Sequence, residues 1–336
     1  MHSRVAAVRA PRTHNRRRVT GSSGRRREGR ESEPQRPNMS RRVFTFAVLL
    51  LLVVMWMCCG SGAANAVESR SGDAQQPQLA DIFVPGKTQV VAKDGSASGT
   101  MLSFSIPSLT SAGGVMAVFA QGVVLHFSPD EQKKGVSQAD VVAGYINSAW
   151  DWSSLVAEVN MNTWRAYAIL SIKREADLVG IAFNPTTIAK GNKVFLLVGS
   201  GERKYDNNTK NWKLSDTDIQ LVVGEATQFK EGEQSGKINW SGPVSLLKQI
   251  TDGSQSDAKA FYPGGGTGVL MEDGTLVLPV QGENDNEPIP MIIYSTDDGN
   301  SWDVSKGTPP AKCLNIRITE WEKGQILMVL QCENGQ

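Results

Sequence analysis

From residue 67 onward, short apolar segments alternate with turn-forming stretches rich in Gly, Asp and Asn. Segments of this length that are bounded by such turns are typical of β-strands. We therefore predict an all-β body, with a short helix or an irregular insertion at residues 137–147. The predicted strands cover residues 115–119, 166–172, 194–198, 219–223, 276–280, 291–295 and 326–330, and the turns cover residues 111–114, 190–192, 272–275 and 298–300.

One predicted turn carries the pattern called an Asp box, formed by Ser295, Asp297, Gly299, Ser301 and Trp302. We expect Asp297 to accept backbone N–H groups of its own turn, and Gly299 to adopt a positive φ that bulkier residues resist. Ser301 would tie the turn together, and Trp302 would bury its ring under the returning strand. The box predicts a fold rather than an activity. The alternative is an ordinary Asp-x-Gly hairpin.

The first 66 residues differ in composition from the rest, with 13 Arg and three acidic residues. Residues 1–38 lack apolar periodicity, so we predict a disordered Arg-rich extension, with a nucleic-acid-binding arm as the alternative. Residues 39–66 fit a signal peptide, with a basic start, an apolar run over residues 43–59 and cleavage after Ala66. An uncleaved signal anchor is the alternative, because the run is near membrane-spanning length. Met1 and Met39 both stay open as the natural start.

Residues 67–336 carry 22 basic and 31 acidic residues, a net charge of about −9, although the whole chain has a net charge of +1. An acidic body argues against nucleic acid as a partner. Together with the signal peptide, it predicts a protein of the secretory pathway that is secreted or held at the cell surface. Membrane contact would come only from an uncleaved signal or a C-terminal anchor.

Cysteine and histidine usage limits the chemistry that the body can perform. Cys313 and Cys332 can form a disulfide in an oxidising compartment, but the sequence does not fix their geometry. His126 is the single histidine after residue 66. A histidine-based triad or a zinc site is therefore not expected, and we predict no cofactor and no metal.

Two N-glycosylation sequons occur in polar segments, at Asn207 and at Asn239. In a secreted protein both are candidate acceptors, and the alternative is an unmodified surface asparagine. Residues 264–266 are three glycines, but no Lys-Ser/Thr pair follows them. They are therefore interpreted as a loop that permits close backbone approach rather than a phosphate-binding loop.

Several longer motifs resemble those of the trypanosomal trans-sialidase-like surface glycoproteins. The resemblance implies a sialidase-type six-bladed β-propeller, of which residues 67–336 would hold the first blades as a partial domain. In that family a lectin-like sandwich and a lipid-anchor signal usually follow. Besides the Asp box, the motifs are residues 39–44, 81–87, 104–107, 143–152, 184–193, 220–225 and 279–281.

The chemistry of the family allows a position-by-position comparison. Sialidases use three arginines to bind the substrate carboxylate, an Asp as acid/base, and a Glu that activates a Tyr nucleophile. By the resemblance, the first arginine position holds Ser105, a sugar-binding Asp is Asn184, and the activating Glu is Asn315. The second arginine falls near Leu330. Each of these positions is substituted.

The remaining catalytic positions are no better matched. The acid/base loop has a different length here, and Asp130 is the only carboxylate near it, which we do not expect to substitute. Arg317 is the arginine nearest to the second position, but at a different spacing and strand parity. The nucleophile and the third arginine would fall beyond residue 336. We therefore assign no catalytic residue.

The tryptophans suggest one further candidate contact. Trp212 falls roughly where the family stacks aromatic side chains on an acceptor sugar, and the alternative is loop or core packing. The other tryptophans of the body are predicted to pack within blades, namely Trp150, Trp152, Trp164, Trp240 and Trp321.

Three functions follow from these observations. The leading hypothesis is a catalytically inactive glycoprotein that acts in adhesion by binding a host surface protein, matrix or sialoglycan. The second is an exo-α-sialidase or trans-sialidase acting on sialylated glycans through displaced residues. The third is a truncated product without a function of its own.

Overall fold

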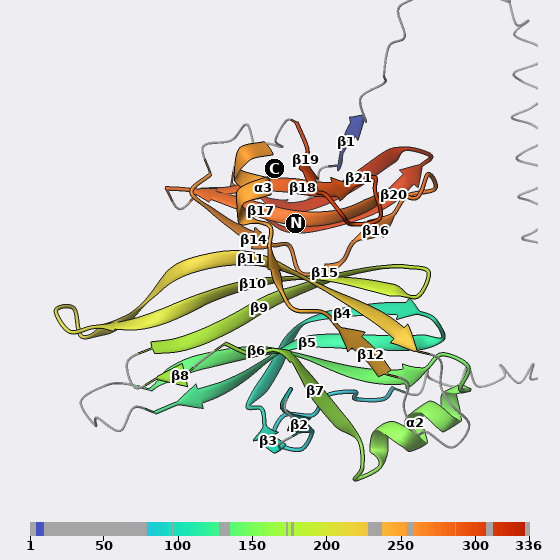
Figure 1. Cartoon of the computed structure of the whole chain (residues 1–336), viewed down its shortest axis with the longest axis vertical. Helices are drawn as coiled ribbons and strands as arrows, with labels where there is room; N and C mark the ends of the chain where they lie inside the picture. Colours follow the sequence, from blue (N-terminus) through green and yellow to red (C-terminus); the bar gives the residue numbers. More distant parts are fainter. Residues whose placement is uncertain are drawn as a thin grey trace, which may run out of the picture. The chain divides into compact units, whose positions relative to one another are not determined.

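The computed structural model describes residues 5–9, 79–93, 95, 97–127, 135–172, 174–175, 178–227, 237–253, 258–285, 287–306 and 312–332. The predicted all-β class is confirmed. Within these ranges the helices are α2 (Trp152–Asn160) and α3 (Leu247–Gly253), and strands make up most of the rest (Figure 1).

Four consecutive strands form a first antiparallel meander, because each strand pairs with the next one along the chain. Two short strands extend it, since β2 pairs in parallel with the last strand of the meander and β3 pairs with β2. The strands are β4 (Ser103–Ala112), β5 (Val115–His126), β6 (Val136–Asn147) and β7 (Arg165–Leu170), extended by β2 (Gln89–Val91) and β3 (Ala97–Thr100).

A second meander follows the same rule and contains the longest hairpin of the chain. It joins the first meander through one parallel pair, Ala139 opposite Ile181. Its strands are β9 (Leu178–Lys190), β10 (Lys193–Asp206), β11 (Asn211–Thr227) and β12 (Lys237–Trp240). The short strands β8 (Arg174–Glu175), β13 (Val244–Ser245) and β15 (Gly266–Thr267) add to it.

The third sheet and the last hairpin repeat the pattern. Meanders that recur in this way are the blades of a β-propeller, which is the predicted fold. The third sheet contains β14 (Ala260–Pro263), β16 (Val269–Leu270), β17 (Leu276–Asn284), β18 (Glu287–Ser295) and β19 (Asp303–Val304). The hairpin is formed by β20 (Cys313–Glu322) and β21 (Gln325–Cys332).

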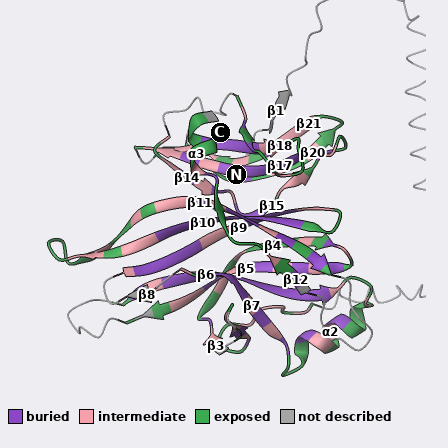
Figure 2. Ribbon diagram, in the orientation of Figure 1, coloured by how far each residue is buried: buried purple, intermediate pink, exposed green. Residues whose placement is uncertain are grey.

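Much of the hydrophobic core lies between neighbouring sheets. One cluster, which includes Phe119 and Leu196, packs the first meander against the second. A second cluster, which includes Phe195 and Leu278, packs the second meander against the third sheet. Figure 2 shows the corresponding buried stretches along the middle of the strands. Each sheet is therefore stabilised by the apolar surface that its neighbours cover.

A buried polar link also joins distant parts of the chain. The Ser108 and Thr187 hydroxyl oxygens lie 2.5 Å apart and share a hydrogen bond. Ser108 also donates to the carbonyl oxygen of Gly266 at 2.7 Å. The three residues come from β4, β9 and β15, so this link fixes how their strands meet.

The prediction of a helix or insertion at residues 137–147 is wrong, because these residues form the central strand β6. Nearly every residue of this strand is buried, on both faces of the sheet. A strand that is covered on both faces shows no apolar–polar alternation, which explains the error. The following helix α2 was not predicted; its N-cap Asp151 accepts a 2.7 Å hydrogen bond from the backbone N–H of Ser154.

Part of the Arg-rich extension has structure, although residues 1–38 are predicted to be disordered. Strand β1 (Val5–Arg9) pairs antiparallel with the free edge of β21. An edge strand offers unpaired N–H and C=O groups, so a short extended segment can add to it. The predicted signal peptide at residues 39–66 lies outside the described residues. Within the described ranges no helix is both long and apolar enough to cross a membrane.

Candidate functional site

The Asp box closes the turn after β18 with a network of short hydrogen bonds. Asp297 accepts from the Ser301 backbone N–H at 2.9 Å and from the Ser301 hydroxyl at 2.6 Å. Ser295 donates to Asp297 at 2.8 Å and accepts from the backbone N–H of Gly299 at the same distance. The hydrogen bonds from Ser301 lower the pKa of Asp297 from 3.8 to about 2. The side chain of Asp297 therefore stays ionised at neutral pH and stabilises its own turn.

Gly299 and Trp302 fasten this turn to the neighbouring meander. Gly299 has a φ of +85°, and a Cβ atom there would lie 2.3 Å from the Phe195 ring. Trp302 is 4% exposed and meets the same ring edge-on, with centroids 6.4 Å apart. The turn packs against β10, so glycine is needed both for its backbone angle and for its size.

Five segments meet through hydrogen bonds at a second place, which we call the polar cluster. The backbone N–H of Asn184 donates to the Gln121 side chain at 3.3 Å, and the Asn184 amide donates to the Pro263 carbonyl at 3.1 Å. The Thr186 hydroxyl donates to the Asn184 carbonyl at 3.1 Å. The backbone N–H of Gly265 donates to Thr186 at 2.8 Å. The polar cluster comprises residues 104–107, Gln121, Asn184, Thr186, residues 264–266 and Arg317.

The structure brings two of the predicted positions into this cluster. Ser105 lies opposite Gln121 in the β4–β5 register, and Gln121 binds the backbone of Asn184. Gly265 approaches so closely that a Cβ atom there would lie 2.6 Å from Ile106. The interpretation of the glycine run as a loop for close backbone approach agrees with this contact. Sequence reasoning did not identify Gln121, because it pairs with Asn184 across 63 residues of chain.

Left-handed backbone occurs at two non-glycine residues of the polar cluster and at Asn315, which lies two residues before Arg317 in the chain. Ile106, Asn184 and Asn315 have φ angles of 50°, 52° and 54°. Left-handed backbone is costly for a β-branched residue such as Ile106, and more accessible to asparagine. Two of the three are themselves predicted catalytic or ligand positions, and Ile106 directly follows a third, Ser105. Strained backbone of this kind clusters at functional sites, where the surrounding structure holds it in place.

Arg317 supplies the only formal charge in the polar cluster. Its Nη1 group donates to the carbonyl oxygens of Gly264, Gly265 and Ile316 at 3.2, 3.4 and 2.8 Å. No ion pair found among the described residues includes this arginine. The guanidinium is therefore anchored on one side by backbone while the side chain stays exposed. Sequence reasoning had set Arg317 aside because of its spacing.

The hairpin of β20 and β21 carries both Asn315 and Leu330, the residue near which the second arginine position is predicted. Leu330 packs into the hydrophobic cluster between this hairpin and the third sheet. Gln331 is the residue that faces Asn315, whose amide donates to it at 2.8 Å.

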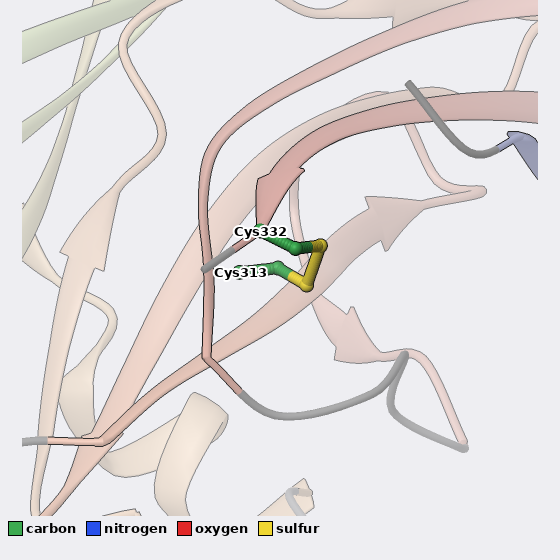
Figure 3. The surroundings of a disulfide bond; sticks show 2 residues. All are labelled: Cys313 and Cys332. Atoms are coloured by element: carbon green, nitrogen blue, oxygen red, sulfur yellow. A yellow bond between two sulfur atoms is a disulfide. The ribbon is translucent and has the colours of Figure 1, made fainter. Parts of the chain in front are cut away.

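The same hairpin carries the cysteine pair. Cys313 and Cys332 lie directly opposite one another in the register of the two strands. Figure 3 shows the disulfide that joins them. The disulfide joins the two strands at the open end of the hairpin, two residues from Asn315 along the chain.

Trp212 does not join the polar cluster through any described contact. It lies opposite Tyr205 near the tip of the β10–β11 hairpin, and the two rings meet edge-on with centroids 5.4 Å apart. Both sequon asparagines, Asn207 and Asn239, are exposed.

The other tryptophans divide into two groups. Trp164 is buried and donates to the Ile82 carbonyl at 2.8 Å, and Trp240 donates to the Tyr145 hydroxyl at the same distance. Trp152 and Trp321 are 49% and 70% exposed, so the prediction that they pack within blades is wrong for these two.

Some predicted residues cannot be placed. Asp130 lies outside the described residues, and the side chain of His126 is likewise not described. Among the described residues no group of three His, Cys, Asp or Glu side chains is arranged to hold a metal ion. The described polar cluster can donate and accept hydrogen bonds and can attract an anion through Arg317.

Residues 106–336 match the family model of the BNR repeat-like domain. The chain is 43% identical over 280 residues to Sialidase 85-1.1 of Trypanosoma cruzi, an alignment that covers 82% of the chain and 37% of that relative. It is 32% identical over 190 residues to another T. cruzi sialidase, covering 55% of the chain and 15% of that protein.

The chain is also similar to solved structures of sialidases. The chain is similar to Trypanosoma rangeli sialidase, with a TM-score of 0.60 and 25% identity over 76% of the chain and 39% of that structure. The same enzyme in complex with 2,3-difluorosialic acid, as a covalent intermediate, matches with a TM-score of 0.59 and 26% identity over the same shares. The chain thus spans well under half the length of these proteins.

Proposed function

Because this chain belongs to the family of BNR repeat-like domains and is a trans-sialidase-like protein, we propose that it binds sialylated glycans without cleaving them. In this proposal it is a secreted or cell-surface glycoprotein, and its ligands belong to a host surface or matrix. The observation that carries the proposal is the combination of left-handed backbone and neutral side chains at positions that, by the resemblance, correspond to catalytic or ligand residues. Left-handed backbone occurs at or beside three positions that hold Ser105, Asn184 and Asn315.

These side chains support binding more than turnover. The asparagine amide has no titratable group near neutral pH, so Asn315 cannot draw a proton from a nucleophile. A serine hydroxyl makes single hydrogen bonds and cannot form the two-pronged, charge-assisted pair that an arginine makes with a carboxylate. A site built in this way can still hold a hydroxyl-rich ligand.

The unused hydrogen-bonding groups indicate what such a ligand would look like. Within the described ranges Arg317 uses only its Nη1 group, which leaves its Nη2 and Nε groups available. Gln121 uses only its carbonyl oxygen and Asn184 only its amide nitrogen as side-chain groups. One cationic donor beside neutral amides fits a sugar with several hydroxyls and one carboxylate.

The test combines binding and turnover on the same preparation. We expect sialyllactose to bind more tightly than lactose in a titration followed by NMR. Arg317→Ala should weaken the binding of sialyllactose roughly tenfold to 100-fold, because one charge-assisted hydrogen bond is lost. Arg165→Ala is the matched control, since that arginine also donates to backbone carbonyls but lies beside α2. Release of a fluorescent aglycone from a sialoside should stay at the level of a heat-treated blank.

Arg317 is also the observation that favours the alternative, a sialidase with displaced residues. In that case aglycone release would accompany the purified protein and fall with Arg317→Ala or Asp130→Asn. Such turnover would overturn the proposal of a non-cleaving protein. Binding that Arg317→Ala leaves unchanged would overturn the choice of site.

A further inference from the structure

The β10–β11 hairpin reaches beyond the sheet to which it belongs. Strand β10 pairs with β9 as far as Lys204, and beyond that point Tyr205 pairs with Trp212 and Asp206 with Asn211 across the hairpin. Figure 1 shows the two strands running past their neighbours to the tip of the hairpin.

The turn at the tip is fixed by its first residue. Asp206 accepts from the backbone N–H groups of Asn208 at 2.9 Å and Thr209 at 3.4 Å. Lys213 donates to Asp206 across the hairpin, and the pKa of the Asp206 carboxyl is lowered, first by that hydrogen bond. Lys210 closes the turn with a φ of 53°. The sequon that begins at Asn207 is therefore displayed on a rigid turn whose residues 207–210 are all exposed.

An aromatic pair lies directly behind this sequon. Tyr205 and Trp212 are opposite one another, so both side chains lie on one face of the hairpin, and each is half-buried. Asn207 follows Tyr205 by two positions and is the first residue of the turn, so a glycan attached there begins next to the end of the hairpin that carries the pair. A pyranose ring has an apolar face of C–H groups, and such a face packs well on an aromatic ring.

The second sequon lacks these features. Asn239 lies within β12 opposite Glu225, and the ring N–H of Trp240, in the same sequon, donates a hydrogen bond to the Tyr145 hydroxyl. Ser241 accepts from the backbone N–H of Val223 at 3.2 Å. Asn239 therefore serves as an internal control for what the turn and the aromatic pair contribute.

We propose that Asn207 carries an N-linked glycan whose first sugar packs on the Tyr205–Trp212 pair. The glycan comes from a lipid-linked oligosaccharide of the secretory pathway. A bond forms between Asn207 Nδ2 and C1 of the first sugar, and the bond from C1 to the pyrophosphate oxygen breaks. The pyrophosphate leaves with the electron pair, the amide loses one proton, and nothing is oxidised or reduced. In this arrangement Trp212 contacts a sugar that is attached to the chain itself, rather than a sugar of a bound ligand.

The first experiment measures occupancy. The full chain is expressed in a eukaryotic secretory host, and its peptides are analysed by mass spectrometry with and without N-glycosidase. We expect glycan at Asn207, which Asn207→Gln and Thr209→Ala remove and Thr209→Ser retains. Secreted protein with an unmodified Asn207 would overturn the proposal, whatever the state of Asn239.

The second experiment is a double-mutant cycle between glycan and ring. Tyr205→Leu should lower Tm by about 2–4 °C more in the glycosylated chain than in Asn207→Gln, because only the former loses the sugar contact. Trp212→Leu provides a second cycle if Tyr205→Leu folds poorly. The same cycles in the Asn239→Gln background should show the same coupling. Additive effects in both cycles would overturn the packing of the sugar on the pair.

Discussion

The Asp-box turn and the polar cluster both contain left-handed backbone, but they differ in what holds it. In the turn, Asp298 and Gly299 have φ angles of 60° and 85°, and the hydrogen bonds of Asp297 and Ser295 lie within the same few residues. In the polar cluster, Ile106 and Asn184 are held by contacts with chain segments far away in the sequence.

The two regions therefore differ in how far their side chains are needed for the stability of the fold. A turn that satisfies its own polar groups stabilises the fold directly, so its side chains are tied to stability. The frame of the polar cluster depends on packing by its neighbours, so exposed side chains there can change with little cost in folding free energy. In this way the backbone of a site can stay the same within a family while the side chains that carry out its chemistry change.

Gly299→Ala should have the largest effect on stability, because it destabilises the turn in two ways. Left-handed backbone costs alanine about 1–2 kcal/mol, and the contact of its Cβ with Phe195 adds about 1–3 kcal/mol. We expect the free energy of unfolding to fall by about 2–5 kcal/mol in a denaturant titration. Gly324→Ala is the matched control, since that glycine has a φ of 73° and no atom within 4 Å of its missing Cβ. Equal losses in the two variants would contradict the close packing of the turn.

Asp297→Asn should have a smaller effect that depends on pH. The native carboxyl has a pKa of about 2, below its ordinary value of 3.8, so its stabilising effect is fully present above about pH 4. The effect is lost as the pH falls toward 2, because the native carboxyl then becomes protonated. The difference in Tm between wild type and variant should therefore shrink over this window in melts at stepped pH. A difference that is constant from pH 7 to pH 2.5 would argue against the ionised turn.

Asn315→Gly should have the smallest effect on stability. Glycine accepts the φ of 54°, and the lost hydrogen bond to Gln331 is exposed, so the change should stay within about 0.5 kcal/mol. Chemical denaturation measures it. A loss as large as that of Gly299→Ala would mean that the side chain of Asn315 supports the fold, and the contrast between the two regions would not hold.

The sequence predicts the Asp box well because the hydrogen bonds among Ser295, Asp297, Gly299 and Ser301 lie within one short stretch of chain. It predicts β17 and β18 of the third sheet for a similar reason, since each contains a short apolar run between marked turns. It misses β6 because a strand that is buried on both faces has no alternation.

The polar cluster was only partly predictable. The resemblance identified Ser105, Asn184 and Asn315 because they sit in recognisable motifs. It noted Arg317 only as a poorly spaced arginine and did not identify Gln121 or Gln331, since the importance of all three comes from contacts across the fold rather than from a local pattern. Asn184 binds Gln121 and Pro263 across 63 and 79 residues, and no short-range rule reports such a pairing.

The buried link of Ser108, Thr187 and Gly266 has a consequence for the order in which the protein folds. It joins segments that are 79 and 158 residues apart, so closing it carries a large loss of chain entropy. Meanders whose strands follow one another directly can form earlier and faster. The main strands of the first two meanders, β4 to β12, are synthesised before Gly266. Until then the hydroxyls of Ser108 and Thr187 lack the carbonyl group that completes their link. The hydrogen-bonded contact between the first two blades is therefore completed only after Gly266 has been added to the chain.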